Sequence, residues 1–151
     1  MLTVIEPGAL TTVQDLGRPG WARYGIPPSG PMDRAAFAAA NALVGNPPDA
    51  AALEITLTGP TLHVAREALV AVCGASFELR ADRMAVPMWH AVYLRAGTYL
   101  RFGRRRSGAR AILAIAGGLT VPAFLDSRST YLAGAFGGYE GRALRTGDRL
   151  P

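Results

Sequence analysis

Residues 53–79, "LEITLTGPTLHVAREALVAVCGASFEL", decide the fold class. They contain four short apolar runs separated by Gly, Pro and charged residues: 53–57, 61–64, 69–73 and 76–79. Runs of this length between turn formers are typical of β-strands in an antiparallel barrel or sandwich. Similar runs stand at 2–5, 91–94, 98–102 and 111–117, and a weaker one at 119–125. The sequence therefore predicts a mostly β domain.

One segment, residues 31–44, has the pattern of a helix. Pro31 suits the first helical position, Asp33 suits the positive helix end, and Gly45 is a stop signal. The alanine-rich stretch between them predicts a single helix near residues 31–44. We expect its apolar stripe to consist of Met32, Ala36, Ala39 and Leu43.

The totals indicate one domain and exclude several mechanisms. The chain has 151 residues, 50% of them hydrophobic, which is enough for one core. All 16 basic residues are arginines, so the chain offers neither a Schiff-base lysine nor a Walker lysine. The basic run "RRRSGAR" at 104–110 lacks interleaved aromatic residues. We therefore predict a solvated turn between strands there, and no nucleic-acid binding.

The sequence also indicates no membrane span and no metal site. No apolar run reaches the roughly 20 residues that cross a bilayer, and "MLTVIEPG" has no signal-peptide pattern, so we expect a cytoplasmic protein without a membrane partner. Cys73 is the single cysteine and is expected to be a buried thiol. His63 and His90 are interpreted as structural residues. One cysteine and two histidines are in any case too few ligands for a closed zinc site.

Two glycine-rich segments call for an explanation. Residues 11–33, "TTVQDLGRPGWARYGIPPSGPMD", contain four glycines and four prolines, with Trp21, Tyr24 and Ile26 as candidate anchors. This composition predicts an ordered, shaped loop that lines the main polar cleft. Residues 136–148, "FGGYEGRALRTGD", are interpreted as a close-packed turn, because no helix follows to make a phosphate cradle.

Four runs in order, at 11–33, 38–60, 114–130 and 137–150, resemble the family of the C-type subunit of 5-oxoprolinase. This family is also called PxpC, KipA or allophanate hydrolase subunit 2, and it is similar to part of the carboxyltransferase region of urea carboxylase. The resemblance implies that residues 1–151 form a single cyclophilin-like β-barrel domain, the N-terminal half of a longer protein. One departure is Asp126, where the family usually has glycine, which puts the local turn geometry in question.

The resemblance implies one component of an ATP-dependent 5-oxoprolinase complex, which opens the small-molecule lactam 5-oxoproline to glutamate. It also implies B-type (PxpB/KipI-like) and A-type partner subunits, and ATP and Mg²⁺ at the level of the complex. The chain alone is then expected to be inactive. Two alternatives stay open: a KipA-like regulatory protein that sequesters an inhibitor of a kinase, and a carboxyltransferase component related to urea carboxylase.

The matching motifs supply the candidate site residues. The candidates for catalysis are Gln14, Asp15 and Arg18, and the candidates for substrate binding are Ser29, Asn41, Arg128, Ser129 and Thr130. An arginine fork grips a carboxylate bidentately, side-chain amides read an amide group, a carboxylate holds Mg²⁺ or orients water, and hydroxyls donate hydrogen bonds. If Arg18 grips the substrate, Arg18→Ala lowers turnover far more than stability.

Structural roles stand beside these functional ones. A structural role for Asp15 and Arg18, in which they pair with each other or cap backbone groups, is as much expected as a functional one. Ser29 is likewise as much expected to start the helix as to bind a ligand. Asp33 is expected to compensate the helix dipole. Glu54 has an alternating strand position that faces either solvent or a pocket.

Overall fold

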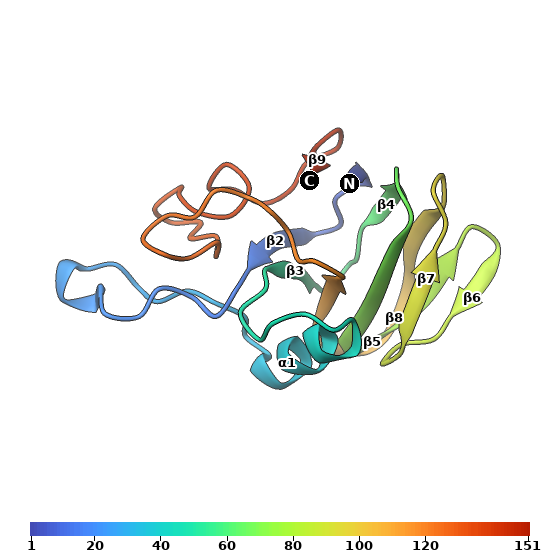
Figure 1. Ribbon diagram of the computed structural model, residues 1–151, viewed down its shortest axis with the longest axis horizontal. Coiled ribbons are helices and arrows are strands. Elements are labelled where there is room, and N and C mark those ends of the chain that lie inside the picture. Colours follow the sequence, from blue (N-terminus) through green and yellow to red (C-terminus); the bar gives the residue numbers. More distant parts are fainter.

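A curled antiparallel sheet makes up most of the protein in the computed structural model, which describes residues 1–151 (Figure 1). The strand order is β2-β3-β8-β4-β1-β9, and β5 pairs with β6, β7 and β8. The sheet and a single α-helix confirm the prediction of a mostly β, barrel-like fold with one helix. The strands are β1 Leu2–Glu6, β2 Leu10–Gln14, β3 Ala52–Thr56, β4 Thr61–Val64, β5 Ala68–Ala81, β6 Met84–Val86, β7 Ala91–Leu94, β8 Tyr99–Ile115 and β9 Arg149–Leu150.

The longest strand, β8, corrects the prediction of a turn at 104–110. These residues are mostly exposed, but they continue β8 between the two predicted strands, and β8 pairs with β5 along most of its length. Register shifts between Gly74 and Leu79 bend the pair, so a long strand follows the curvature without a break. The predicted runs 69–73 and 76–79 likewise merge into β5.

The shortest strands and one irregular segment also differ from the prediction. The sequence did not predict β2, β6 or β9, which carry weak apolar signals of two to five residues. The run 119–125 forms no strand, only an isolated bridge between Phe124 and Ser127. Strand pairing therefore depends on partners that are distant in the sequence, which local patterns do not reveal.

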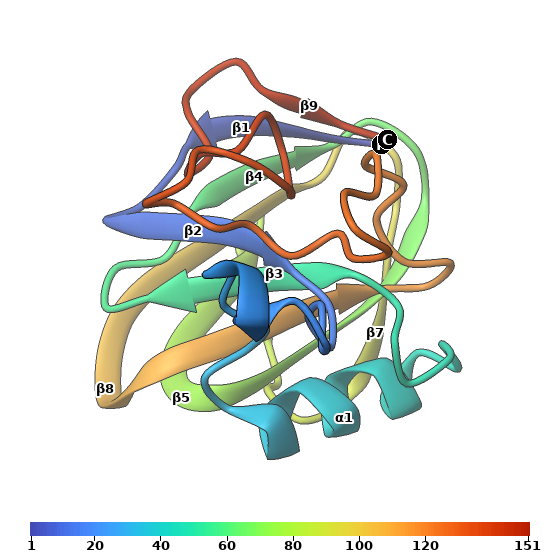
Figure 2. The same ribbon diagram turned by 90° about the vertical axis from the view of Figure 1, so that its left-hand side faces the viewer.

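The core fills the inside of the curled sheet. Alternate residues of β2, β3 and β8, among them Val13, Leu53, Ile55 and Leu113, are fully buried in a cluster of 22 residues. The opposite face of β3, β5 and β8 is covered at one end by α1, Arg34–Leu43 (Figure 2). The part of the outer face that lies on β2 and on the rest of β3 is not covered by α1, and it forms the floor of the pocket described below.

The helix begins later than predicted. Asp33 is the N-cap, and its carboxylate accepts a hydrogen bond from the Ala36 N–H at 2.9 Å. Ser29 therefore does not start the helix, and Met32 lies outside it, 74% exposed. The predicted stripe was wrong in part, because the buried face consists of Ala36, Phe37, Ala40 and Asn41. No helix of the structure is long and apolar enough to cross a membrane.

The single cysteine is buried, as predicted, and each histidine contacts a neighbouring group of the protein. Cys73 is buried between α1 and the sheet, and burial raises the pKa of its thiol to about 11. The His63 ring packs at 4.9 Å from the Tyr99 ring. His90 is exposed, with one ring nitrogen 2.8 Å from the Met88 carbonyl oxygen.

The segment 11–33 is ordered, but Tyr24, one of its three predicted anchors, is exposed. Residues 11–14 belong to β2, and a short 3₁₀ helix spans Ala22–Tyr24 in the part that projects from the sheet at the left of Figure 1. Tyr24 is 61% exposed, so this aromatic residue does not hold the segment in place. A hydrogen bond of 2.7 Å from the Arg18 N–H to the Pro28 carbonyl closes the projecting part instead.

The turn at 142–148 is held by a bidentate ion pair. Arg142 contacts the two carboxylate oxygens of Asp148 at 2.7 and 2.9 Å, and the Arg145 N–H donates to the same carboxylate. These hydrogen bonds, that of Arg142 foremost, lower the pKa of Asp148 below its usual 3.8. The turn packs tightly, as predicted for 136–148, and it leads into β9, which pairs with β1.

We expect Asp148→Asn to reduce stability in a pH-dependent way. A lowered folded-state pKa contributes stability above the unfolded pKa, and this contribution is lost as pH falls through the folded pKa. The variant should therefore lose about 1.5–3 kcal/mol at pH 7, the worth of charge-assisted hydrogen bonds. Urea unfolding at pH 7 and well below pH 3.8 measures this difference. Asp49→Asn, at an exposed position, is the control, and an equal loss at both pH values would contradict the ion-pair explanation.

Candidate functional site

Most predicted site residues meet where β2 ends against the segment 127–130. Gln14, Asp15, Arg18, Ser29, Ser129 and Thr130 are joined there by hydrogen bonds. These bonds connect parts of the chain that are more than a hundred positions apart. We call Asp15, Arg18, Ser29, Ser127 and Ser129 the buried polar cluster.

Asp15 is the acceptor at the centre of this cluster. Its carboxylate, 6% exposed, accepts hydrogen bonds from the Ser127 hydroxyl at 2.6 Å, the Ser129 hydroxyl at 2.7 Å and the Gly17 N–H at 2.8 Å. The Arg128 N–H donates to the second carboxylate oxygen. Magnesium would need free carboxylate oxygens and room for several waters. Four inward-pointing donors leave neither, so Asp15 does not fit the Mg²⁺ that the family implies.

Arg18 is equally enclosed. The side chain is 1% exposed and donates to the Ser29 hydroxyl at 2.9 Å, to the Ser129 carbonyl, and more weakly to the Phe124 carbonyl at 3.4 Å. Its guanidinium lies 5.1 Å from the centre of the Phe136 ring. Burial lowers its pKa, and the charge of Asp15 opposes that shift. Asp15 and Arg18 form no direct ion pair with each other. Each of them binds backbone and hydroxyl groups instead, which is the second of the two structural roles expected from the sequence.

The remaining predicted residues are also held by the protein. The Thr130 hydroxyl donates to the Val13 carbonyl at 2.9 Å, and Arg128 Nε donates to the Val121 carbonyl at 3.0 Å. Asn41 does not join the others, because it lies on α1, where its amide donates to Ala50 and accepts from Asn46.

Tight backbone packing surrounds the cluster. A Cβ at Gly137 would meet the Ser129 carbonyl oxygen at 2.2 Å, and one at Gly138 would meet the Thr130 hydroxyl at 1.9 Å. Both glycines have positive φ, as does Asp126 at 60°, a backbone conformation that glycine adopts more readily than other residues. The turn 136–148 thus packs against the cluster, as a close-packed turn does, and leaves no phosphate cradle.

A pocket of about 380 Å³ opens beside the buried polar cluster, and we call it the β2–β3 pocket. Its lining is mainly apolar but includes a few polar and charged side chains. Its floor is the outer face of β2 and β3, and its walls are the segments 27–32 and 130–133. Several residues of the loop 11–33 line this pocket, but Asp15 and Arg18 are not among its lining residues. The lining residues are Leu10, Thr12, Gln14, Pro27, Ser29, Gly30, Met32, Glu54, Arg110, Thr130, Tyr131, Leu132 and Ala133.

Two charged side chains in this pocket were not among the predicted site residues. Glu54, whose strand position allowed solvent or a pocket, faces the pocket, and its Oε1 accepts the Met32 N–H at 2.7 Å. Its Oε2 lies 3.8 Å from Arg110. Burial raises the pKa of Glu54, and the hydrogen bond from Met32 and the charge of Arg110 offset part of this shift. Arg110 ends the run 104–110, where only the pairing of β8 with β3 reveals its neighbours.

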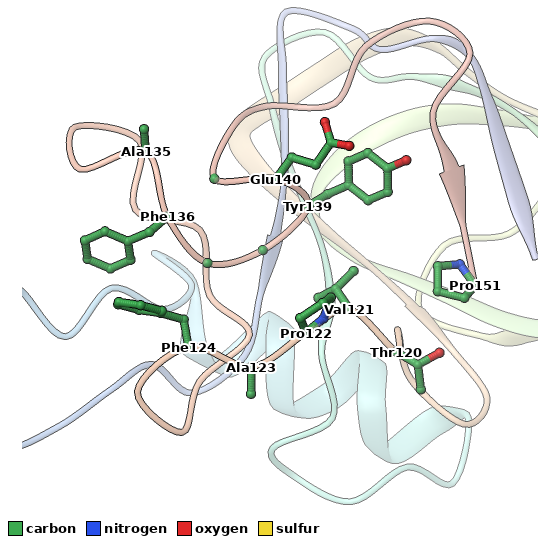
Figure 3. A pocket seen from close by; sticks show the side chains of 13 residues that line it. Thr120, Val121, Pro122, Ala123, Phe124, Ala135, Phe136, Tyr139, Glu140 and Pro151 are labelled. Carbon is green, nitrogen blue, oxygen red and sulfur yellow. The ribbon is translucent and has the colours of Figure 1, made fainter.

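A second pocket, of about 480 Å³, is mainly apolar (Figure 3). Phe124 and Phe136 lie side by side at one end, with ring centroids 4.7 Å apart, and Tyr139 lies further along. None of the eight predicted site residues lines this pocket. The only charged side chain in its lining is Glu140.

Comparisons with known proteins agree with the resemblance found in the sequence. Residues 24–151 match the family model described as "Carboxyltransferase domain, subdomain A and B". The chain is 44% identical over 151 residues to the C-type subunit of 5-oxoprolinase from Escherichia coli, covering all of this chain and 49% of that protein.

Two yeast proteins are equally similar in sequence. Urea amidolyase of Saccharomyces cerevisiae is 44% identical over 98% of this chain, which spans 8% of that protein. The crystal structure of Kluyveromyces lactis urea carboxylase superposes with a TM-score of 0.97 at 44% identity, covering 99% of this chain and 13% of the other. The chain thus spans about half of the bacterial relative and a small part of the yeast ones.

Proposed function

The chain belongs to the family of carboxyltransferase domains, subdomains A and B, and on this premise we propose that it is the amide-binding part of a C-type 5-oxoprolinase subunit. The complete protein, with A-type and B-type subunits, opens 5-oxoproline to glutamate at the expense of ATP. The observation that carries this proposal is the β2–β3 pocket between 27–32 and 130–133, with amide and charged side chains in a mainly apolar lining, together with 44% identity to the E. coli protein over the whole chain.

Within this proposal the buried polar cluster holds the pocket walls. Asp15 ties the β2 end to residues 127–129, and Arg18 ties Ser29 to Ser129, so both walls start from one rigid junction. Rigid walls keep a small ligand in one orientation, which is a large part of what a binding site contributes to a reaction. Asp15 and Arg18 are then positioning residues rather than groups that touch the substrate.

ATP and Mg²⁺ belong elsewhere in this proposed complex. When bound, ATP makes the lactam carbonyl easier to attack. Residues 1–151 do not fit it, since Asp15 has no free carboxylate oxygen and the turn 136–148 is filled by its own packing. The proposal therefore assigns the nucleotide to another part of the complex, and this chain to the lactam.

Carboxyl transfer is the second candidate, because the chain is equally identical, at 44%, to urea amidolyase and to the E. coli 5-oxoprolinase protein. Urea and 5-oxoproline share an N–C=O group, so one pocket chemistry serves both. The reactions differ in the co-reactant: ATP-dependent ring opening in one case, and transfer of a carboxyl group from carboxybiotin to urea in the other.

The experiment that tests the proposal is an activity assay on a fusion protein. Residues 1–151 are joined to the half of the E. coli C-type subunit that they do not cover, and the fusion is mixed with the E. coli A-type and B-type subunits. We expect ATP hydrolysis that depends on 5-oxoproline, and none from residues 1–151 alone. Transfer of carboxyl groups to urea without 5-oxoproline-dependent ATP hydrolysis would favour the second candidate. Full turnover by the isolated chain would show that the site is misplaced.

A further inference from the structure

The β2–β3 pocket contains one pair of charged side chains, Glu54 and Arg110, that do not use all of their hydrogen-bonding capacity within the protein. Gln14 donates to Thr12 and Thr130 and accepts from Gly30. The Thr130 hydroxyl donates to the Val13 carbonyl, and the Ser29 hydroxyl accepts from Arg18. A ligand in the pocket therefore finds few free partners among the predicted residues. Glu54 and Arg110, in contrast, keep hydrogen-bonding atoms that no other group of the protein occupies.

The sheet itself brings these two residues together. Leu53 and Ile55 point into the core, so Glu54 and Thr56 point outward from β3. Arg110 of β8 is the direct partner of Thr56, which places it diagonally opposite Glu54 on the same outer face. The pair is thus built on two paired strands and not on a loop.

Glu54 keeps one carboxylate oxygen open to the pocket. Its Oε1 accepts the Met32 N–H, whereas Oε2 accepts no hydrogen bond and lies 3.8 Å from Arg110 Nη1. No buried side-chain nitrogen or oxygen in the structure lacks a partner. Oε2 is therefore not sealed, although the side chain is only 6% exposed. A free acceptor in such an enclosed place binds a donor more strongly than one in open water.

Arg110 keeps its donors. Nη1 donates to the Thr56 hydroxyl, and no protein acceptor lies within hydrogen-bond distance of Nε or Nη2. The 3.8 Å separation from Glu54 is too long for a direct hydrogen bond. The side chain is 32% exposed and also borders a second depression near Met32 and Asp33.

We propose that Glu54 and Arg110 together bind the N–C=O edge of a neutral amide in which the N–H and the C=O lie on the same side. Glu54 Oε2 accepts the N–H, and the Arg110 guanidinium donates to the carbonyl oxygen. A lactam ring and urea both present such an edge, whereas an ordinary trans peptide bond does not. The inference rests on the proposed function and names the groups that read its substrate.

The charges of the pair favour this class of ligand over a free anion. Glu54 and Arg110 carry opposite charges, and Asp33 lies close enough to add to the negative potential at Glu54. An isolated carboxylate on Arg110 would meet both acidic groups, while a neutral amide offers one donor and one acceptor to match. Arg18 and Arg128, the arginines predicted from the sequence to grip a substrate, have donors bound to protein carbonyls instead.

The test uses two variants and a matched control pair. Glu54→Gln keeps an oxygen for the Met32 N–H and puts an NH₂ group near the ligand N–H, and Arg110→Met keeps most of the side-chain length without donors. Glu78→Gln and Arg106→Met alter an exposed pair, 3.0 Å apart on the same sheet but outside the β2–β3 pocket. Thermal unfolding of all four confirms that they are folded.

The first readout is binding of the lactam 2-pyrrolidinone to the ¹⁵N-labelled chain, followed by NMR through the amide signals of Gly30 and Met32. We expect saturable shifts for the wild type, with N-methyl-2-pyrrolidinone binding about 10-fold or more weakly because it lacks the N–H. Glu54→Gln and Arg110→Met should weaken lactam binding about 10- to 100-fold, and the control pair should not change it. Absence of lactam binding, equal binding of the N-methyl compound, or unchanged binding by both variants would each overturn the inference.

The second readout separates this inference from the proposed function. In the fusion protein with its partner subunits, both variants should raise the KM for 5-oxoproline about 10- to 100-fold, with a smaller change in kcat. If the wild-type fusion hydrolyses no ATP in response to 5-oxoproline but the chain binds 2-pyrrolidinone through the pair, the proposed function fails and the amide site stands. If the fusion is active and neither variant changes KM, the amide site fails and the function stands.

Discussion

Asp15→Ala is expected to lower the free energy of unfolding by about 3–5 kcal/mol, the cost of removing one partner from a buried charged network. The substitution deprives the Ser127 and Ser129 hydroxyls and the Arg128 N–H of their common acceptor in a site from which water is largely excluded. For a chain of this size the melting temperature should fall by roughly 6–20 °C. Chemical denaturation and thermal unfolding measure both quantities.

The control for this variant is Asp49→Ala, which removes a carboxylate at an exposed position without hydrogen-bond partners. A change within about 0.5 kcal/mol is expected there. Asp15→Asn is informative in addition, because its amide keeps one acceptor but turns a donor toward groups that are themselves donors. Stability of Asp15→Ala equal to that of Asp49→Ala would mean that the cluster does not hold the two segments together.

Arg18→Ala is expected to cost a similar amount, about 3–5 kcal/mol, because it leaves the Ser129 carbonyl unpaired, removes the donor to the Ser29 hydroxyl and opens a cavity beside Phe136. From the sequence alone, Arg18→Ala was expected to lower turnover far more than stability. The structure instead predicts a large loss of stability. Arg18→Lys should recover only part of the loss, since a single ammonium does not reproduce the fork. The melting temperature of each variant is the measurement.

Arg104→Ala, at an exposed position of β8, is the matched control for the loss of an arginine. The double variant Asp15→Ala/Arg18→Ala should lose less than the sum of the two single losses, because both residues hold the same segments through Ser129. An unchanged melting temperature of Arg18→Ala, combined with loss of 5-oxoproline turnover in the fusion protein, would restore the ligand-binding role predicted from the sequence.

The sequence predicted the fold class because strand patterns are local. Apolar runs of four or five residues between turn formers marked β3, β4 and β7 closely, and a cap followed by alanines marked α1. The same local reasoning failed at 104–110, where exposed arginines looked like a turn but extend β8. Strand continuity there depends on pairing with β5, and no pattern within seven residues carries that information.

The candidate site, like the fold, was predicted from the sequence only in part. The motifs selected residues that meet in space, since Gln14, Asp15, Arg18, Ser29, Ser129 and Thr130 do form one cluster with its adjoining pocket. The residue types did not reveal which polar atoms keep hydrogen-bonding capacity for a ligand. Arg18 and Arg110 are chemically identical, but one is surrounded by carbonyls and the other has open donors. That difference is set by strand register and by residues far away in the chain.

The pairing of β1 with β9 bears on how the protein folds during its synthesis. Leu2 pairs with Leu150 and Thr3 with Arg149, so β1 shares a ladder with a strand that lies more than a hundred positions later in the chain (Figure 2). The buried polar cluster likewise needs Ser127 and Ser129 before Asp15 has its partners. Such distant contacts slow folding, because a long loop must close before they form. A ribosome-bound chain that stops short of residue 127 lacks the donors that enclose Asp15, so we expect the buried polar cluster to form only after residues 127–129 have been made.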